Sequence, residues 1–140
     1  MAGQRVIPML GYEDVGRAAD WIADAFGFEE TGRWSDGDGR VTQAEMEFYG
    51  SAFMLGWPSP DYRSPRRHAQ ECEQARKWSE VPYVFDGVYV RVDDISAHYE
   101  RAKAAGAKIL SELEDNQAAR QRQYRAEDLE GHRWMFAERY

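Results

Sequence analysis

Two helix signals of the same kind occur in the two halves of this 140-residue chain. Asp14 precedes an apolar face with helical spacing that stops at Gly27, and Asp94 precedes a second such face that stops at Gly106. An aspartate side chain accepts hydrogen bonds from the backbone N–H groups of a first helical turn, and glycine adopts the left-handed conformation that ends a helix. The chain therefore predicts two helices in equivalent places, and this pairing constrains the fold more than any other feature.

Strand-like runs surround each predicted helix in the same order. Residues 5–11 precede the first helix, residues 87–92 precede the second, and three further runs rich in β-forming residues follow each helix. Residue identity between the halves is low, so the shared order of elements carries the argument for a repeat. We expect an α+β fold with two βαβββ modules, at about 4–57 and about 87–140, within one domain of residues 1–140.

A connector of residues 58–86 joins the two predicted modules. It contains four of the five prolines and a charged middle that predicts a short helix. A basic group, Arg63, Arg66 and Arg67, lies among acidic residues, which favours a solvated loop over a binding patch. A connector of this length is either a lid or interface element, or an insertion that the protein surface tolerates.

Charge and cysteine content bear on the partners and the location of the protein. The net charge is -7, and an acidic surface lacks the clustered Lys and Arg that bind phosphate backbones, so we expect no nucleic-acid partner. No apolar run is long enough to span a membrane, so we expect no membrane partner. The single cysteine, Cys72, cannot form a disulfide within the chain, which favours the cytoplasm.

Four stretches, which together cover the chain except for the connector, point to a known superfamily. They are "YEDVGRAADWIADAFGFEE", "AEMEFYGSAFML", "VYVRVDDISAHYERAKAAGAKIL" and "YRAEDLEGHRWMF". In this order they resemble the vicinal oxygen chelate superfamily, and most closely its glyoxalase- and bleomycin-resistance-like branch. The resemblance implies two βαβββ modules whose mixed sheets curl around a central cavity, and it implies a homodimer.

Metal-using members of that superfamily hold a divalent ion with His or Glu side chains at fixed strand positions. Three of the four positions fall here on Ile7, Gly87 and Met135, and only Glu47 supplies a carboxylate. A stable site for a hard divalent cation needs three or more protein ligands, and Ile, Gly and Met side chains do not bind such an ion. We therefore expect no metal and no other cofactor.

His132 lies in the segment "EDLEGHRWMF", directly after Gly131. Glycine favours a tight reversal of the chain, so this segment predicts the turn of the last hairpin. We expect His132 to hydrogen-bond nearby backbone and to fix that hairpin, rather than to bind a metal.

Alternation along the predicted strands separates helix-facing residues from residues that face the implied cavity. The candidate ligand-binding residues on the cavity side are Met9, Glu45, Glu47, Tyr89, Arg91, Arg133 and Met135. Buried charge is costly unless it is paired, so these residues either pair with one another or line a pocket for a small organic ligand. Trp34 and Trp57 belong either to the rim of that pocket or to the core.

These observations leave three functions open. The first is a metal-independent, homodimeric protein that binds a small-molecule ligand such as a drug or metabolite. The second is a lyase or isomerase of the glyoxalase-like group, in which Glu47, or Glu45 in its place, is the catalytic general base. The third is a protein-interaction module that uses the connector.

Overall fold

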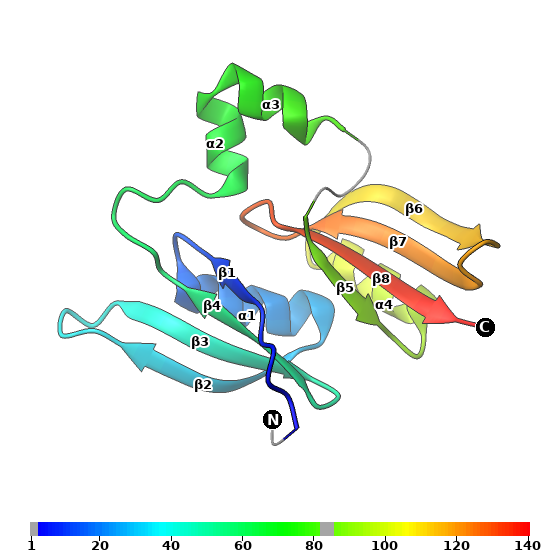
Figure 1. Cartoon of the computed structure of the whole chain (residues 1–140), viewed down its shortest axis with the longest axis horizontal. Helices are drawn as coiled ribbons and strands as arrows, with labels where there is room; N and C mark the ends of the chain where they lie inside the picture. The colour runs from blue at the N-terminus through cyan, green and yellow to red at the C-terminus, as the bar shows by residue number, and fades with distance from the viewer. Residues whose placement is uncertain (1–2, 82–85) are drawn as a thin grey trace. The chain divides into compact units, whose positions relative to one another are not determined.

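The computed structural model describes residues 3–81 and 86–140, and it divides the chain into two compact units, Met1–Ser64 and Pro65–Tyr140 (Figure 1). Each unit contains one open four-stranded mixed sheet with a helix packed on it. The predicted α+β fold with two βαβββ modules is confirmed. None of the helices in the described part of the chain is long and apolar enough to cross a membrane.

The first unit has the predicted order of elements. These are β1 (Met9–Gly11), α1 (Val15–Phe26), β2 (Glu29–Ser35), β3 (Val41–Phe48) and β4 (Ser51–Gly56). The strands lie side by side in the order β1-β4-β3-β2, with β1 parallel to β4 and the other neighbours antiparallel (Figure 1). Strand β1 is shorter than the predicted run of residues 5–11, which is consistent with Pro8, because proline has no N–H to donate to a sheet.

Helix α1 begins and ends where the sequence predicts. The Asp14 carboxylate accepts a hydrogen bond from the backbone N–H of Arg17 at 3.1 Å, and Gly27 ends the helix with a φ of 80°. The apolar face of α1 packs on β3, where Ala44 and Met46 are fully buried. Because burying one large apolar side chain contributes about 1.5–3 kcal/mol, this packing stabilises α1 more than helix propensity does.

The second unit adds two connector helices to the predicted module. Its elements are α2 (Pro65–Glu71), α3 (Glu73–Ser79), β5 (Val88–Arg91), α4 (Ile95–Ala104), β6 (Lys108–Asn116), β7 (Gln121–Glu127) and β8 (Arg133–Arg139). The strand order is β5-β8-β7-β6, which repeats the order of the first sheet (Figure 1). The short helix predicted in the connector is thus a pair of short helices.

Helix α4 packs on an aromatic layer of β7 and β8. The Asp94 carboxylate caps α4 by accepting from the Ala97 N–H at 3.1 Å, as predicted. Tyr124, Trp134 and Phe136 are fully buried in this layer. The His98 Nδ1 atom lies 2.6 Å from the Tyr124 hydroxyl oxygen, so a polar contact joins α4 to the sheet as well.

The turn between β7 and β8 is organised by Asp128, which has no exposed surface. Its carboxylate accepts hydrogen bonds from the backbone N–H groups of Glu130 and His132, both at 3.0 Å, and from Trp134 Nε1 at 3.1 Å. The backbone of His132 therefore belongs to the hairpin, as expected, and the residue that fixes the turn is Asp128.

Helix α2 is attached to this same turn through Arg66. Its guanidinium donates to the backbone oxygens of Leu129 at 2.9 Å and Asp128 at 2.8 Å, and its backbone N–H donates to the Glu130 oxygen at 3.0 Å. A Cβ atom at Gly131, whose φ is 95°, would lie 2.7 Å from the Arg66 nitrogen. The prediction that Arg66 belongs to a solvated loop is wrong, because its donors match backbone acceptors that are distant in the sequence.

Candidate functional site

Each sheet has one face covered by its helix and one face directed away from it, here called the far face. Ala44 and Met46 are buried beneath α1, and Trp134 and Phe136 are buried beneath α4, as the alternation predicts. Because side chains alternate along a strand, the candidate ligand-binding residues fall on the two far faces.

The far face of the first sheet brings Met9 and Glu45 into one row. Met9 on β1 pairs with Met54 on β4, and Met54 pairs with Glu45 on β3. The Glu45 carboxylate accepts a hydrogen bond from the Thr31 hydroxyl at 2.8 Å, while Met9 is 64% exposed. This row combines a flexible apolar surface with a positioned carboxylate.

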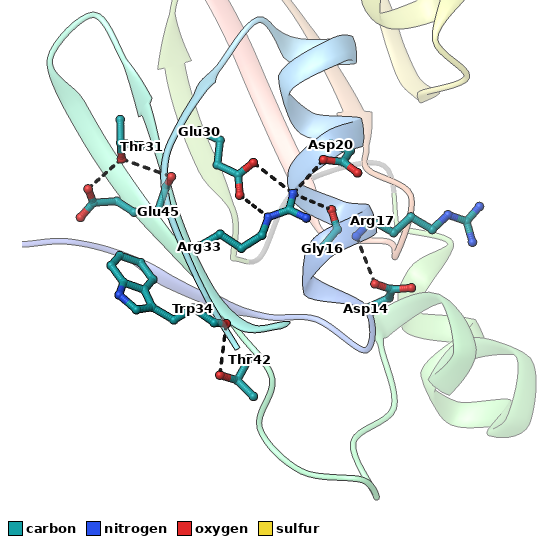
Figure 2. Close-up of polar contacts among 10 residues, drawn as sticks. All are labelled: Asp14, Gly16, Arg17, Asp20, Glu30, Thr31, Arg33, Trp34, Thr42 and Glu45. Carbon is teal, nitrogen blue, oxygen red and sulfur yellow. Dashed lines mark hydrogen bonds and ion pairs between the residues drawn. The ribbon is translucent and has the colours of Figure 1, made fainter. Parts of the chain in front are cut away.

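The indole of Trp34 lies along the same far face. Gly32 makes this possible, because a Cβ atom there would come within 2.5 Å of the Trp34 ring. Figure 2 shows Trp34 and Glu45 on one side of the sheet, whereas Arg33 points to α1. There the Arg33 guanidinium bonds Glu30 at 2.6 Å and Asp20 at 2.8 Å. Trp34 is 49% exposed, so it offers an aromatic surface rather than core packing.

Trp57 has a different environment from Trp34. The Arg40 guanidinium carbon lies 4.4 Å from the centre of the Trp57 ring, a distance typical of a cation–π contact. Trp57 is half-buried beneath that cation. Of the two tryptophans, Trp34 is therefore the one whose ring lies on the far face.

Glu47, the candidate general base, faces another carboxylate. It pairs with Glu29 across β2 and β3 and with Ala52 across β3 and β4. Like charges directly opposite each other in a sheet repel. Among the described residues no hydrogen bond or ion pair reaches the half-buried side chain of Glu47.

The far face of the second sheet carries one row that crosses all four strands. Tyr89 on β5 pairs with Met135 on β8, Met135 pairs with Arg125 on β7, and Arg125 pairs with Ser111 on β6. Tyr89 and Met135 are thus brought together as the sequence predicts. Arg91 lies two residues from Tyr89 on the same strand and is exposed.

A hydrogen-bonded network of side chains lies beside this row. The Tyr89 hydroxyl donates to Gln121 Oε1 at 2.7 Å, and Gln121 Nε2 donates to Gln123 Oε1 at 2.8 Å. Gln123 Nε2 in turn donates to Glu114 at 3.3 Å. Gln121 and Gln123 are almost fully buried, so the network holds the Tyr89 ring in a defined position.

Arg133 contacts the end of the connector. Its guanidinium donates to the backbone oxygen of Val81 at 3.1 Å and to that of Ser79, and it lies 3.6 Å from Glu127. Glu127 also lies 3.5 Å from the Arg66 guanidinium. These contacts give Arg133 a structural role at the turn end of β8, and its part in ligand binding stays a prediction.

Sequence reasoning missed the residues that β6 and β7 contribute to this far face. They include Ser111, Glu114, Gln121, Gln123, Arg125 and Glu127. The signal was available for β7, because "QRQYRAE" alternates between these polar residues and the helix-facing Tyr124 and Ala126. It was weak for β6, because register shifts interrupt the alternation between Ile109 and Glu114.

Comparisons with known proteins identify the family. Residues 7–136 match the Glyoxalase/Bleomycin resistance protein/Dioxygenase superfamily. The chain belongs to this superfamily. The solved structure of TioX from Micromonospora sp. ML1 is similar, with a TM-score of 0.72 and 30% identity over 99% of this chain and 100% of that chain.

Two further proteins are similar to this chain, one by structure and one by sequence. FosX, a genomically encoded fosfomycin resistance protein from Listeria monocytogenes, has a TM-score of 0.66 at 11% identity, over 100% of this chain and 96% of that chain. The uncharacterized protein Rv0887c of Mycobacterium tuberculosis is 29% identical over 135 residues, which are 94% of this chain and 72% of that protein. At 11% identity FosX shows a common fold and nothing about chemistry.

The superfamily's divalent metal does not fit the residues at its usual positions. Ile7 offers an aliphatic side chain, Gly87 offers none, and Met135 lies between Tyr89 and Arg125 in the sheet. Glu47 faces Glu29 alone. Within residues 3–81 and 86–140, no three His, Cys, Asp or Glu side chains gather in a group that suits a metal ion.

Proposed function

We propose that this protein binds a small organic molecule without a metal ion, and that the ligand contacts the far face of a sheet. The observation that carries the proposal is the chemistry of the residues at the positions where metal-using relatives hold their ion. Where metal-using relatives need carboxylates or histidines, this chain has Ile7, Gly87 and Met135. Exposed aromatic side chains, Trp34 and Tyr89, lie beside polar groups on the same faces.

Mixed aromatic and polar surfaces of this kind suit organic ligands of drug or metabolite size. The seven candidate ligand-binding residues remain part of this proposal. We also propose a homodimer in the cytoplasm. The homodimer follows from the superfamily resemblance, and the cytoplasm follows from the single cysteine, Cys72.

The proposal is tested by metal analysis and by a thermal-shift screen of the full chain, purified without chelator. The screen covers antibiotics, aldehydes, thiol conjugates and aromatic acids. A ligand that binds only the folded state raises the melting temperature by mass action. We expect such a ligand in the presence of EDTA, and we expect Trp34→Ala to weaken its binding roughly tenfold, because stacking on an aromatic ring contributes about 1–1.5 kcal/mol.

Trp78→Ala is the matched control, because Trp78 is an exposed tryptophan on α3, at 61%. The control variant is expected to bind as the unmodified chain does. Stoichiometric Zn, Ni, Mn or Fe in the purified protein would contradict the proposal, and so would equal losses in both variants.

A second candidate is a lyase or isomerase in which Glu47 transfers a proton. The observation in its favour is that the Glu47 carboxylate faces Glu29 and has no cation beside it among the described residues. A Glu47→Gln variant separates the two functions, with Glu29→Gln as its control. If Glu47→Gln loses turnover and keeps its ligand affinity, the result supports the enzyme. If the unmodified chain shows no turnover and Glu47→Gln keeps the ligand affinity, the result supports the binding protein.

A further inference from the structure

Two buried polar atoms on the far face of the second sheet have no hydrogen-bond partner among the protein groups that the structure describes. They are Ser111 Oγ on β6 and Arg125 Nε on β7. In the described residues, no other buried side-chain nitrogen or oxygen atom lacks a hydrogen bond. The two residues pair directly across β6 and β7, yet no hydrogen bond joins their side chains. A buried donor without a partner costs about 1–3 kcal/mol, so a folded chain rarely retains two of them side by side without a function.

The carboxylates of this part of the sheet are engaged elsewhere. Glu127, the next far-face residue along β7, lies 3.6 Å from Arg133 and 3.5 Å from Arg66. Glu114 accepts from Gln123, and the Glu112 carboxylate accepts from the Tyr99 hydroxyl on the α4 side. No protein carboxylate among the described residues therefore bonds the Arg125 guanidinium.

The same row continues into an apolar and aromatic surface. Arg125 pairs with Met135, and Met135 pairs with Tyr89, which is 47% exposed. The Tyr89 hydroxyl is already bonded to Gln121, so its ring, rather than its hydroxyl, is what it offers to a ligand. The row thus runs from two unbonded donors to an aromatic ring on one face.

We infer that Arg125 and Ser111 form an oxyanion subsite, which rests on the proposed small-molecule function and names its ligand class. The ligand is an amphiphilic organic anion, with an apolar or aromatic body on Met135 and Tyr89. Its oxyanion accepts hydrogen bonds from the Arg125 Nε–H and the Ser111 hydroxyl. Charge-assisted bonds to arginine are short and strong, and they select an anion over a neutral analogue of equal shape.

The test uses the full chain and three naphthyl probes that differ in one group. These are naphthalene-2-carboxylate, its neutral carboxamide and 2-naphthyl phosphate, with affinities measured by titration calorimetry. We expect at least one of the two anions to bind roughly tenfold more tightly than the carboxamide. The tighter of the two anions identifies the oxyanion as a carboxylate or a phosphate.

Arg125→Met keeps an unbranched apolar side chain that ends near the position of Nε and removes the guanidinium donors, so it is expected to abolish the preference for the anions. Arg122→Met is the matched control, because Arg122 lies on the same strand but is exposed on the opposite face, where it bonds Ser96. The control is expected to retain the roughly tenfold preference. Equal affinities of the unmodified chain for anion and carboxamide would overturn the subsite. So would an equal preference for the anion in the Arg125→Met and Arg122→Met variants.

Ser111→Ala gives a readout that does not depend on any ligand. Because the hydroxyl has no partner, its removal is expected to raise the melting temperature of the free protein by roughly 3 °C while weakening anion binding. A lower melting temperature would mean that the hydroxyl is bonded within the fold, and it would overturn the inference.

If all three probes bind equally well, small-molecule binding stands and only the oxyanion subsite fails, whereas absence of anion binding at millimolar concentration contradicts the subsite.

Discussion

Asp128 illustrates how much one side chain determines in this chain. It has no exposed surface, and its carboxylate serves two backbone N–H groups of the β7–β8 turn and the indole N–H of Trp134. The residue connects a turn to the core, because Trp134 is fully buried beneath α4. Hydrogen bonds to charged groups contribute about 1.5–3 kcal/mol each, although such bonds are not additive in a network.

We therefore expect Asp128→Ala to lower the free energy of unfolding by roughly 3 kcal/mol, since it leaves three donors, two of them buried, without an acceptor. Urea unfolding followed by tryptophan fluorescence measures this loss. Asp38→Ala, in the exposed turn between β2 and β3, is the control and is expected to change stability by less than about 0.5 kcal/mol. Equal stability of the two variants would show that the turn does not depend on Asp128.

At the scale of elements, the contact between α4 and β7 combines apolar packing with one polar contact. The Tyr124 hydroxyl lies 2.6 Å from His98 Nδ1, and the Tyr99 ring meets the Tyr124 ring edge-on at 5.1 Å between centres. Burial raises the pKa of Tyr124 far above its ordinary value of 10.0, because the phenolate would lose its hydration. Tyr124 is therefore protonated at neutral pH where it contacts α4.

This raised pKa predicts a loss of stability in alkali. As pH rises through about 10, the unfolded chain releases the Tyr124 proton while the folded chain retains it. The stability that protonated Tyr124 contributes is therefore full below about pH 10 and is lost as pH rises toward the folded-state pKa, by up to about 1.4 kcal/mol per pH unit.

Tyr124→Phe removes this loss, because phenylalanine has no proton to release. Urea unfolding at neutral pH and at about pH 11 is expected to show a smaller alkaline loss for the variant than for the unmodified chain. The variant is also expected to be about 1 kcal/mol less stable at neutral pH, because the contact with His98 is lost. Tyr140→Phe, at an exposed tyrosine, is the control, and an alkaline loss that only this control reduces would contradict the assignment.

At the scale of the whole molecule, the connector divides between the two units. Tyr62 bonds the Gly11 oxygen at 2.9 Å within the first unit, whereas α2 and α3 belong to the second. The second-unit part is attached at two places, by Arg66 to the β7–β8 turn and by Arg133 to the end of α3. These attachments argue against a freely tolerated insertion, and a role in binding another protein stays a prediction.

The repeat, the two main helices and the faces of most strands could be predicted from residue types and their spacing. Asp14, Gly27 and Asp94 act through neighbours within four residues, so their roles follow from local chemistry. Strand alternation has a fixed period of two, so it placed Glu45 and Met135 on far faces without any knowledge of the fold. The residues Ile7, Gly87 and Met135 at the metal positions were also readable, because the superfamily resemblance implies where the metal ligands would lie.

Which distant groups meet follows from the folded chain and not from the sequence pattern. Arg66 reaches backbone oxygens more than sixty residues away, and Ser111 opposes Arg125 at a point in β6 that has one register shift on each side. Such contacts depend on strand register and on turn geometry, and sequences with the same apolar pattern can differ in both. Whether a polar atom has a hydrogen-bond partner also depends on its three-dimensional surroundings. The unbonded atoms of Ser111 and Arg125 could therefore be identified only in the folded chain.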